Sequence, residues 1–155
     1  MRLTTLCYVE KDGCWLMMHR VKKNGDENAG KWIGPGGHLL EDETPEECVR
    51  REVREETGLE LKDLRLRGIL TFILPEWGNE MTFLYTAGTE GTERADCPEG
   101  ILKWIPVEKV PELPLWEGDR IFLPLLRTRK DVFSLKLVYA PGGKLIDSHL
   151  EEYGG

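Results

Sequence analysis

The chain has 155 residues, of which 32% are charged and 40% hydrophobic, and its formal net charge is -7. This length predicts one domain over residues 1–155, because it allows a substantial core and leaves no room for a second one. The acidic balance argues against a nucleic-acid polymer as substrate, since phosphate backbones are bound by an excess of Lys and Arg. No apolar run approaches the length of a membrane helix, so no membrane partner is expected.

The first residues and the cysteines predict a cytoplasmic protein. Residues 1–7 lack the apolar core and the cleavage site of a signal peptide. The cysteines show no C-x-x-C spacing, and they stand at Cys7, Cys14, Cys48 and Cys97. We therefore expect small buried thiols in a reducing compartment rather than disulfides or a zinc site.

The N-terminal part of the chain is expected to form two strands and a loop. Residues 3–9 and 14–20 have the composition of strands, and Asp12-Gly13 between them is a turn signal. Residues 21–31 are polar and contain glycine, which predicts a surface loop.

A stiff glycine-rich turn follows at Gly34-Pro35-Gly36-Gly37. Glycine permits positive φ angles and lets backbone N–H groups approach a phosphate closely. Such a run is more often a plain turn when it stands alone. Here it directly precedes a helix that carries carboxylates, so we interpret it as the phosphate-side wall of a metal–diphosphate site.

The residues around this helix carry a full set of capping signals. Thr44 is a good N-cap, Pro45 suits the first helical position, and Glu47 completes a capping box with Thr44. Gly58 supplies a left-handed stop. A helix is therefore predicted from about Pro45 to about Thr57.

Three glutamates on this helix form a candidate metal site. Glu52 and Glu56 lie four residues apart on one face, and Glu55 lies three residues from Glu52. Carboxylates this close raise each other's pKa, and a hard divalent cation removes the repulsion. We expect Mg²⁺, with Mn²⁺ as a substitute. Arg51, four residues before Glu55, is expected to brace that carboxylate.

The alternative for this helix is a solvated acidic surface with ordinary charge pairs. Val49 and Val53 argue against it, because they place Glu52 and Glu56 beside the buried face. The metal site is therefore the preferred interpretation.

The second half of the chain predicts more strands and one more substantial helix. Strands are expected at residues 64–74, 80–87, 101–106, 132–139 and 144–149. A helical turn is expected at Val107–Val110, and a helix at Trp116–Arg127. Mixed strands with two helices predict an α/β fold in which a mixed β-sheet is sandwiched between helices.

The glutamate helix also carries a longer pattern, G-x5-E-x7-R-E-U-x-E-E-x-G-U, where U is apolar. Its positions are filled by Gly37, Glu43, Arg51, Glu52, Val53, Glu55, Glu56, Gly58 and Leu59. This pattern, without gaps or substitutions, resembles the signature of the Nudix hydrolases. The resemblance implies the α/β/α sandwich of the Nudix fold and a single Nudix domain over the chain. It also implies metal-assisted hydrolysis of a nucleoside diphosphate derivative.

The resemblance assigns roles to individual residues. It places the metal at the backbone of Gly36 and at Glu52, Glu55 and Glu56. Glu99, five residues before Trp104, stands where relatives carry an acidic residue that approaches the metals. The implied catalytic set is Glu52, Glu55, Glu56, Glu99 and Arg51, and the implied phosphate loop is Gly36, Gly37 and His38.

Beyond this pattern the chain is similar to the MutT/MutX-type 8-oxo-dGTP diphosphatases. The similarity is carried by Gly30–Gly37 (G-[KR]-W-x-G-x-G-G), by Trp116–Asp119, by Phe133–Tyr139 and by Glu99. It implies hydrolysis of 8-oxo-dGTP to 8-oxo-dGMP and pyrophosphate.

The same resemblance points to a base pocket. An indole at Trp116 can stack on a purine, and the carboxyl of Asp119 can hydrogen-bond its edge. A core anchor and a helix cap are the structural alternatives for these two residues. Further pocket residues are expected to be Ile33, Phe72 and Met81. For Phe72 and Met81, each taken singly, packing in the core is the favoured alternative.

One departure from the vertebrate members of this branch concerns the base pocket. They carry an asparagine at the place of Ile33 and a pair of aspartates near Asp119. Isoleucine has no polar side-chain group, so another purine preference stays open.

Two other functions stay open as well. One is a Nudix enzyme for ADP-ribose, a dinucleoside polyphosphate or an undamaged dNTP. The other is a nucleotide-binding module without hydrolysis, which the intact Glu52, Glu55 and Glu56 disfavour. The sequence leaves open which residue is the general base and how many metal ions bind. It is compatible with a monomer or with a homodimer.

Overall fold

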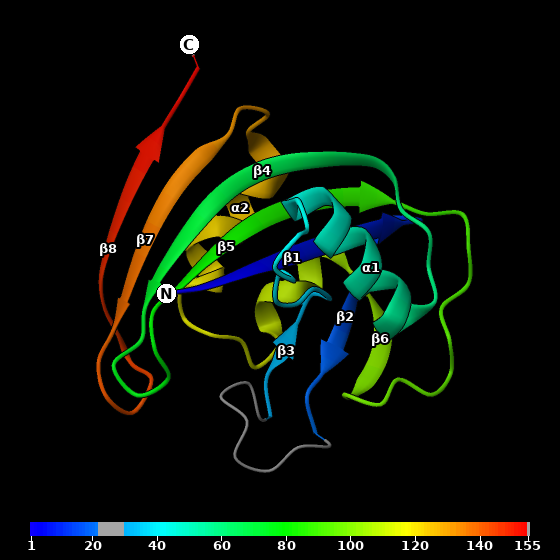
Figure 1. Cartoon of the computed structure of the whole chain (residues 1–155), viewed down its shortest axis with the longest axis horizontal. Helices are drawn as coiled ribbons and strands as arrows, with labels where there is room; N and C mark the ends of the chain where they lie inside the picture. Colours follow the sequence, from blue (N-terminus) through cyan, green and yellow to red (C-terminus); the bar gives the residue numbers. More distant parts are fainter. Residues whose placement is uncertain (22–29, 155) are drawn as a thin grey trace.

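The computed structural model describes residues 1–21 and 30–154, so most of the loop predicted at 21–31 lies outside the described residues. Within them, eight strands form one mixed sheet (Figure 1). The elements, in chain order, are β1 (Arg2–Lys11), β2 (Cys14–His19), β3 (Trp32–Ile33), α1 (Pro45–Thr57), β4 (Lys62–Ile73), β5 (Glu80–Gly88), β6 (Ile101–Pro106), the 3-10 helix η1 (Val107–Glu112), α2 (Asp119–Thr128), β7 (Phe133–Tyr139) and β8 (Leu145–Glu152).

The sheet has the strand order β3-β2-β1-β5-β4-β7-β8, and β6 pairs with β2. β1 runs parallel to β5 and β4 runs parallel to β7, while the other pairs are antiparallel. In the β1–β5 pair, Thr4 lies opposite Thr82 and Leu6 lies opposite Leu84. This register decides which side chains of the two strands share a face.

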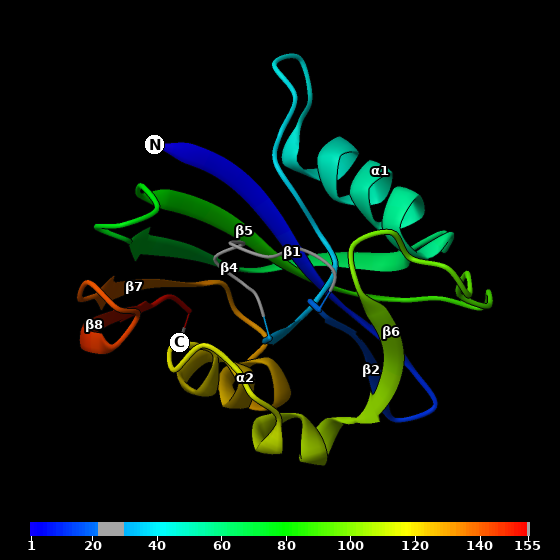
Figure 2. The same cartoon turned by 90° about the horizontal axis from the view of Figure 1, so that it is seen from below.

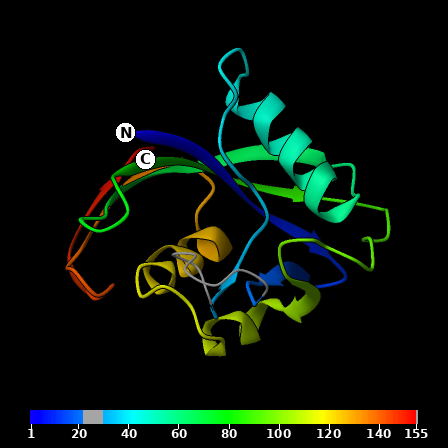
Figure 3. The same cartoon turned by 60° about the horizontal axis from the view of Figure 1, so that its bottom comes forward.

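Helices cover both faces of the sheet (Figures 2 and 3). On one face, Val49 and Val53 of α1 pack in a buried cluster with Cys7. On the other face, Phe122 of α2 packs in a second buried cluster with Leu70. The predicted α/β fold, a mixed sheet between helices, is thus confirmed. None of the helices in the described part of the chain is long and apolar enough to cross a membrane.

The ends of α1 are confirmed with their predicted caps. Thr44 Oγ1 accepts a hydrogen bond from the Glu47 N–H at 3.0 Å, and the Thr44 N–H donates to the Glu47 carboxylate at 2.9 Å. Gly58 closes the helix in the left-handed region at φ 78°. Because these signals are local, they set the start and the end of the helix that carries the glutamates.

The second helix differs from its prediction at the N-terminus. It begins at Asp119 rather than at Trp116, and a turn with a hydrogen bond from the Asp119 N–H to the Trp116 carbonyl precedes it. Gly118 is pressed against β7, where an added Cβ would lie 2.6 Å from the Tyr139 hydroxyl. This contact holds residues 116–118 outside the helix.

Other differences are small. The short strand Trp32–Ile33 was not predicted, since two residues are too few to show alternation. The four cysteines are free thiols, as expected, although Cys14 is only half-buried.

Candidate active site

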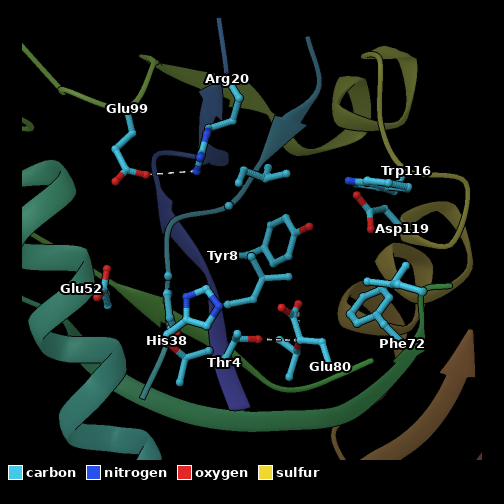
Figure 4. A pocket seen from close by; sticks show the side chains of 18 of the residues that line it. Thr4, Tyr8, Arg20, His38, Glu52, Phe72, Glu80, Glu99, Trp116 and Asp119 are labelled. Carbon is cyan, nitrogen blue, oxygen red and sulfur yellow. Dashed lines mark hydrogen bonds and ion pairs between the residues drawn. The ribbon is translucent and has the colours of Figure 1, made fainter. Parts of the chain in front are cut away.

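A cavity of about 440 Å³ opens beside the Gly34–Gly37 loop and is the site where the predicted groups meet. Glu52 and Glu99 line one end of it, and Trp116, Asp119 and Phe72 line the other (Figure 4). Two of the four carboxylates predicted for the metal therefore share one cavity with residues predicted for the base, whereas Glu55 and Glu56 do not line it.

The loop before α1 is held against β1 at very short range. The Thr5 N–H donates to the Gly37 carbonyl at 2.8 Å. A Cβ added at Gly36 would lie 2.1 Å from the Thr5 carbonyl oxygen, and one added at Gly37 would lie 2.4 Å from the Glu52 carboxyl group. Glycine at position 36 therefore leaves room for the backbone of β1, and glycine at position 37 leaves room for the Glu52 carboxyl group.

His38, which was predicted as a phosphate-loop residue, ends this loop and lines the cavity. Its backbone bridges to Thr4 of β1, and its carbonyl accepts a hydrogen bond from Arg51 at 3.2 Å. The end of the loop is thus fixed from both β1 and α1.

Glu56 is a buried carboxylate, with only 5% of its surface exposed. It accepts a hydrogen bond from the Gly36 N–H at 3.0 Å, which ties α1 to the loop. Burial raises the pKa of Glu56 to about 8, and the charges of Glu99 and Glu52 act in the same direction. Glu56 thus stands at the centre of a group of acidic side chains that repel its charge.

Arg51 organises the other carboxylates of the helix. It was predicted to brace Glu55, and its Nη1 lies 3.3 Å from that carboxylate. It also forms shorter ion pairs with Glu52 at 2.7 Å and with Glu43 at 2.6 Å. Glu43 is thereby shown to hold Arg51 rather than to face the cavity, and the Glu43 pKa falls to about 2 through this contact.

Glu99 lines the cavity opposite α1 and pairs with Arg20 at 3.1 Å. Arg20 follows β2 and was not singled out by any sequence pattern. Its side chain is 12% exposed, so a second cation besides Arg51 lies within the acidic end of the site.

The donors at this end suit a hard divalent cation. Glu52, Glu56, Glu99 and the Gly36 carbonyl supply only oxygen, which is what Mg²⁺ and Mn²⁺ prefer. Within residues 1–21 and 30–154, no three His, Cys, Asp or Glu side chains stand close enough to hold one ion as they are placed. Glu52 instead faces Arg51, and Glu99 faces Arg20. A bound cation would stabilise the charged form of Glu56, which burial disfavours.

Trp116 is fixed at the base end of the cavity by its neighbours. Its ring meets Tyr139 edge-on at a centroid distance of 5.2 Å, and Lys31 Nζ lies 4.9 Å from its ring centroid. The Tyr139 hydroxyl accepts the Gly118 N–H at 2.8 Å, which locks the turn before α2. The indole is thus a rigid wall of the cavity.

The predicted pocket residues are not all brought together. Phe72 and Ile33 line the cavity beside Trp116. On β5, however, the lining residues are Glu80 and Thr82, and Met81 between them projects to the face that α1 covers. Six polar lining residues were not predicted from the sequence, namely Thr4, Thr5, Tyr8, Arg20, Glu80 and Thr82.

Asp119 is a buried acid at the start of α2, with 6% of its surface exposed. Burial raises the pKa of Asp119 to about 7, although the charge of Arg120 and a backbone hydrogen bond from Trp116 oppose this shift. The side chain therefore exchanges its proton near neutral pH.

This shift predicts a pH-dependent effect of Asp119→Asn on stability. The folded protein keeps the Asp119 proton up to pH about 7, whereas the unfolded chain releases it near the ordinary value of 3.8. Stability that is present below pH 3.8 is therefore lost as the pH rises to about 7. Since asparagine has no such charge, we expect the variant to be more stable than the wild type at pH 8, by up to about 4 kcal/mol.

Urea unfolding of both proteins at pH 4.5 and pH 8 measures this effect. Asp42→Asn, at an exposed position, is the matched control and should show no pH-dependent difference. An Asp119→Asn difference of the same size at both pH values would contradict the prediction.

The capped glutamate helix, the glycine loop and the cavity against a mixed sheet together define a Nudix-type hydrolase. The chain matches the family model for the NUDIX domain over residues 2–126, and it therefore belongs to the Nudix family. Enzymes of this family act on pyrophosphate bonds and generally depend on a divalent metal.

The relatives include proteins named for oxidised nucleotides. The chain is 32% identical over 130 residues to an oxidized purine nucleoside triphosphate hydrolase of Danio rerio. The match covers 83% of this chain and 81% of that protein. It is 28% identical over 155 residues to an uncharacterized Nudix hydrolase of Bacillus subtilis, with 95% and 92% covered. A MutT protein of Bacillus halodurans superposes with a TM-score of 0.86 at 28% identity, covering 97% and 98%. The predicted likeness to Nudix and MutT-type proteins is confirmed.

Proposed function

We propose that this Nudix hydrolase is a nucleoside triphosphate diphosphatase that converts oxidised purine dNTPs, such as 8-oxo-dGTP, into the monophosphate and pyrophosphate. It would act as one domain in the cytoplasm, with Mg²⁺ as cofactor, and would remove damaged nucleotides from the pool. The observation that carries the proposal is the shared cavity, which joins Glu52 and Glu99 to Trp116 and Asp119. The name of the Danio rerio relative supports the same substrate class.

The acidic end of the cavity would bind the phosphate chain and position the attacking water. A divalent cation held by Glu52, Glu55, Glu56, Glu99 and the Gly36 backbone would lower the pKa of water and offset charge on the phosphate oxygens. Arg51 keeps Glu52 and Glu55 oriented, and the Gly36–His38 loop presents backbone to the phosphates.

Chemically, the reaction adds a water oxygen to phosphorus and breaks the bond to the oxygen that leaves with pyrophosphate. The proton of the attacking water would pass to a carboxylate of the group around Glu56, where Glu99 is the member outside α1.

The base end would hold the purine against Trp116. We expect Trp116→Ala to raise KM by about 10- to 100-fold, because base stacking on an aromatic ring contributes about 1–3 kcal/mol. The reacting atoms lie at the other end, so kcat should change little. Steady-state kinetics with the best substrate measures both constants.

Trp77→Ala is the control for this prediction, since Trp77 is 41% exposed and does not line the cavity. An unchanged KM in Trp116→Ala would assign Trp116 to core packing instead.

A substrate panel tests the proposed function. Pyrophosphate and phosphate release with Mg²⁺ would be compared for 8-oxo-dGTP, dGTP, 8-oxo-dATP, dATP and ADP-ribose, with Glu56→Gln as the control for contaminating phosphatases. A clear kcat/KM preference for the oxidised purines is expected. A preference for ADP-ribose would contradict the proposed substrate, and nucleotide binding without any turnover would favour a binding module.

The alternative is a Nudix pyrophosphatase for ADP-ribose, a dinucleoside polyphosphate or an undamaged dNTP. Ile33 is the observation in its favour, because this lining residue offers the base no hydrogen bond. The same panel separates the two functions.

A further inference from the structure

Tyr8 of β1 is a buried residue whose hydroxyl group faces the cavity (Figure 4). Only 1% of the residue surface is exposed. The ring is held by Trp15 at a centroid distance of 5.1 Å and by Phe122 at 6.1 Å. Because the ring is packed on both sides, the hydroxyl is fixed in position.

The Tyr8 hydroxyl makes no hydrogen bond with any residue that the structure describes. The other two deeply buried tyrosines are paired: the Tyr85 hydroxyl donates to Glu46, and the Tyr139 hydroxyl accepts the Gly118 N–H. The Tyr8 hydroxyl is not among the fully buried side-chain atoms that lack a partner, so it is open to the cavity and can pair with a ligand atom there.

The surroundings of Tyr8 indicate which part of a nucleotide it would meet. The neighbouring lining residues Leu6, Ile33 and Phe72 offer no side-chain hydrogen bonds, whereas Asp119 presents a carboxyl group at the same end. Burial, and then the charge of Asp119, raise the pKa of Tyr8 well above its ordinary value, so the hydroxyl keeps its proton. The site thus offers a fixed O–H donor together with a carboxyl group.

We propose that the Tyr8 hydroxyl donates a hydrogen bond to a carbonyl oxygen of the substrate base, beside Asp119, and selects purines that carry such a carbonyl. The proposal rests on the proposed function for its nucleotide substrate and goes further by naming the residue that discriminates among bases. An oxopurine has a C=O next to an N–H, which matches a hydroxyl donor beside a carboxylate acceptor. Adenine has no carbonyl and would leave the hydroxyl unpaired.

Tyr8→Phe removes the hydroxyl and keeps the ring contacts with Trp15 and Phe122. We expect it to raise KM for dGTP and 8-oxo-dGTP by about 10- to 100-fold, because a buried carbonyl loses its donor. The KM for dATP should stay unchanged or fall, and kcat should change little, since Tyr8 does not touch the reacting atoms. Tyr85→Phe is the matched control, as its buried hydroxyl lies outside the cavity lining.

Binding of the monophosphates gives a readout that does not depend on turnover. Calorimetry with dGMP, 8-oxo-dGMP and dAMP should show weaker binding of the two oxopurines to Tyr8→Phe than to the wild type, with dAMP unaffected. Equal losses for all three ligands, or none, would overturn the role of Tyr8. Wild-type protein that binds dAMP as tightly as both oxopurines would overturn it without any variant.

These outcomes separate the inference from the proposed function. If the wild type hydrolyses oxidised purine dNTPs but Tyr8→Phe keeps its base preference, the inference fails and the function stands. If the wild type hydrolyses none of the panel but binds oxopurine monophosphates through Tyr8, the function fails and the inference stands.

Discussion

Replacing Glu56 with glutamine is expected to lower kcat by about 10²- to 10⁴-fold, the range of a single positioned proton-transfer or charge-stabilising group. Glutamine has nearly the same shape, and its amide oxygen can still accept the Gly36 N–H that Glu56 accepts at 3.0 Å. It carries no negative charge for a cation and accepts no proton from water. The variant therefore removes the chemistry of the carboxylate while it keeps the contact between α1 and the loop.

The same substitution should not destabilise the protein. Burial raises the pKa of Glu56 to about 8, so the metal-free folded protein already holds this side chain in its neutral form at pH 7. A neutral glutamine then replaces a neutral carboxyl group. Thermal unfolding without metal should give a midpoint equal to or above that of the wild type at pH 8.

Kinetics and unfolding of Glu56→Gln are best compared with Glu41→Gln, which changes an exposed glutamate before the helix. The control should match the wild type in both measurements. Near wild-type turnover in Glu56→Gln would remove Glu56 from the mechanism, whereas a folding defect would make it a structural residue.

The sequence predicts α1 and its glutamates well because their signals are local. Thr44, Glu47 and Gly58 lie within a few residues of the helix ends that they cap. The i, i+4 spacing of Glu52 and Glu56 then fixes their common face without help from the rest of the chain. The base reader at Trp116 came from the resemblance instead, and the structure places it in the cavity.

The remaining lining residues depend on strand pairing, which a single sequence does not fix. Tyr8 and Glu80 share the cavity because β1 pairs in parallel with the distant β5. A shift of one residue in such a pair moves every side chain to the other face. Met81 was expected in the pocket because its side chain is apolar, but its neighbours Glu80 and Thr82 line the cavity instead.

A substitution at Gly36 is expected to damage both the fold and the site. An alanine Cβ there would lie 2.1 Å from the Thr5 carbonyl oxygen and 2.9 Å from the Leu6 Cα, both of them backbone atoms of β1. The strand or the loop has to move, and we expect Gly36→Ala to lower the free energy of unfolding by about 3 kcal/mol or more. Turnover should fall as well, because the Gly36 N–H is the partner of Glu56.

Gly37→Ala should behave differently, although the two glycines are neighbours. The added Cβ would lie 2.4 Å from the Glu52 carboxyl group, which is the mobile end of a side chain. Glu52 can rotate away at a cost of about 1 kcal/mol in stability, but it then leaves Arg51 and the cavity. We expect kcat to fall by about 10- to 100-fold, because displacing a catalytic group by about 1 Å can cost about 100-fold in rate.

Urea unfolding and kcat measured on both variants decide between these effects. Gly142→Ala is the control, because no atom lies within 4 Å of an added Cβ there and only the positive φ of 96° is strained. If Gly37→Ala loses as much stability as Gly36→Ala, the close contact between Glu52 and the loop contributes to the stability of the fold. If it loses turnover alone, the glycine keeps space for a carboxylate whose position matters only to the reaction.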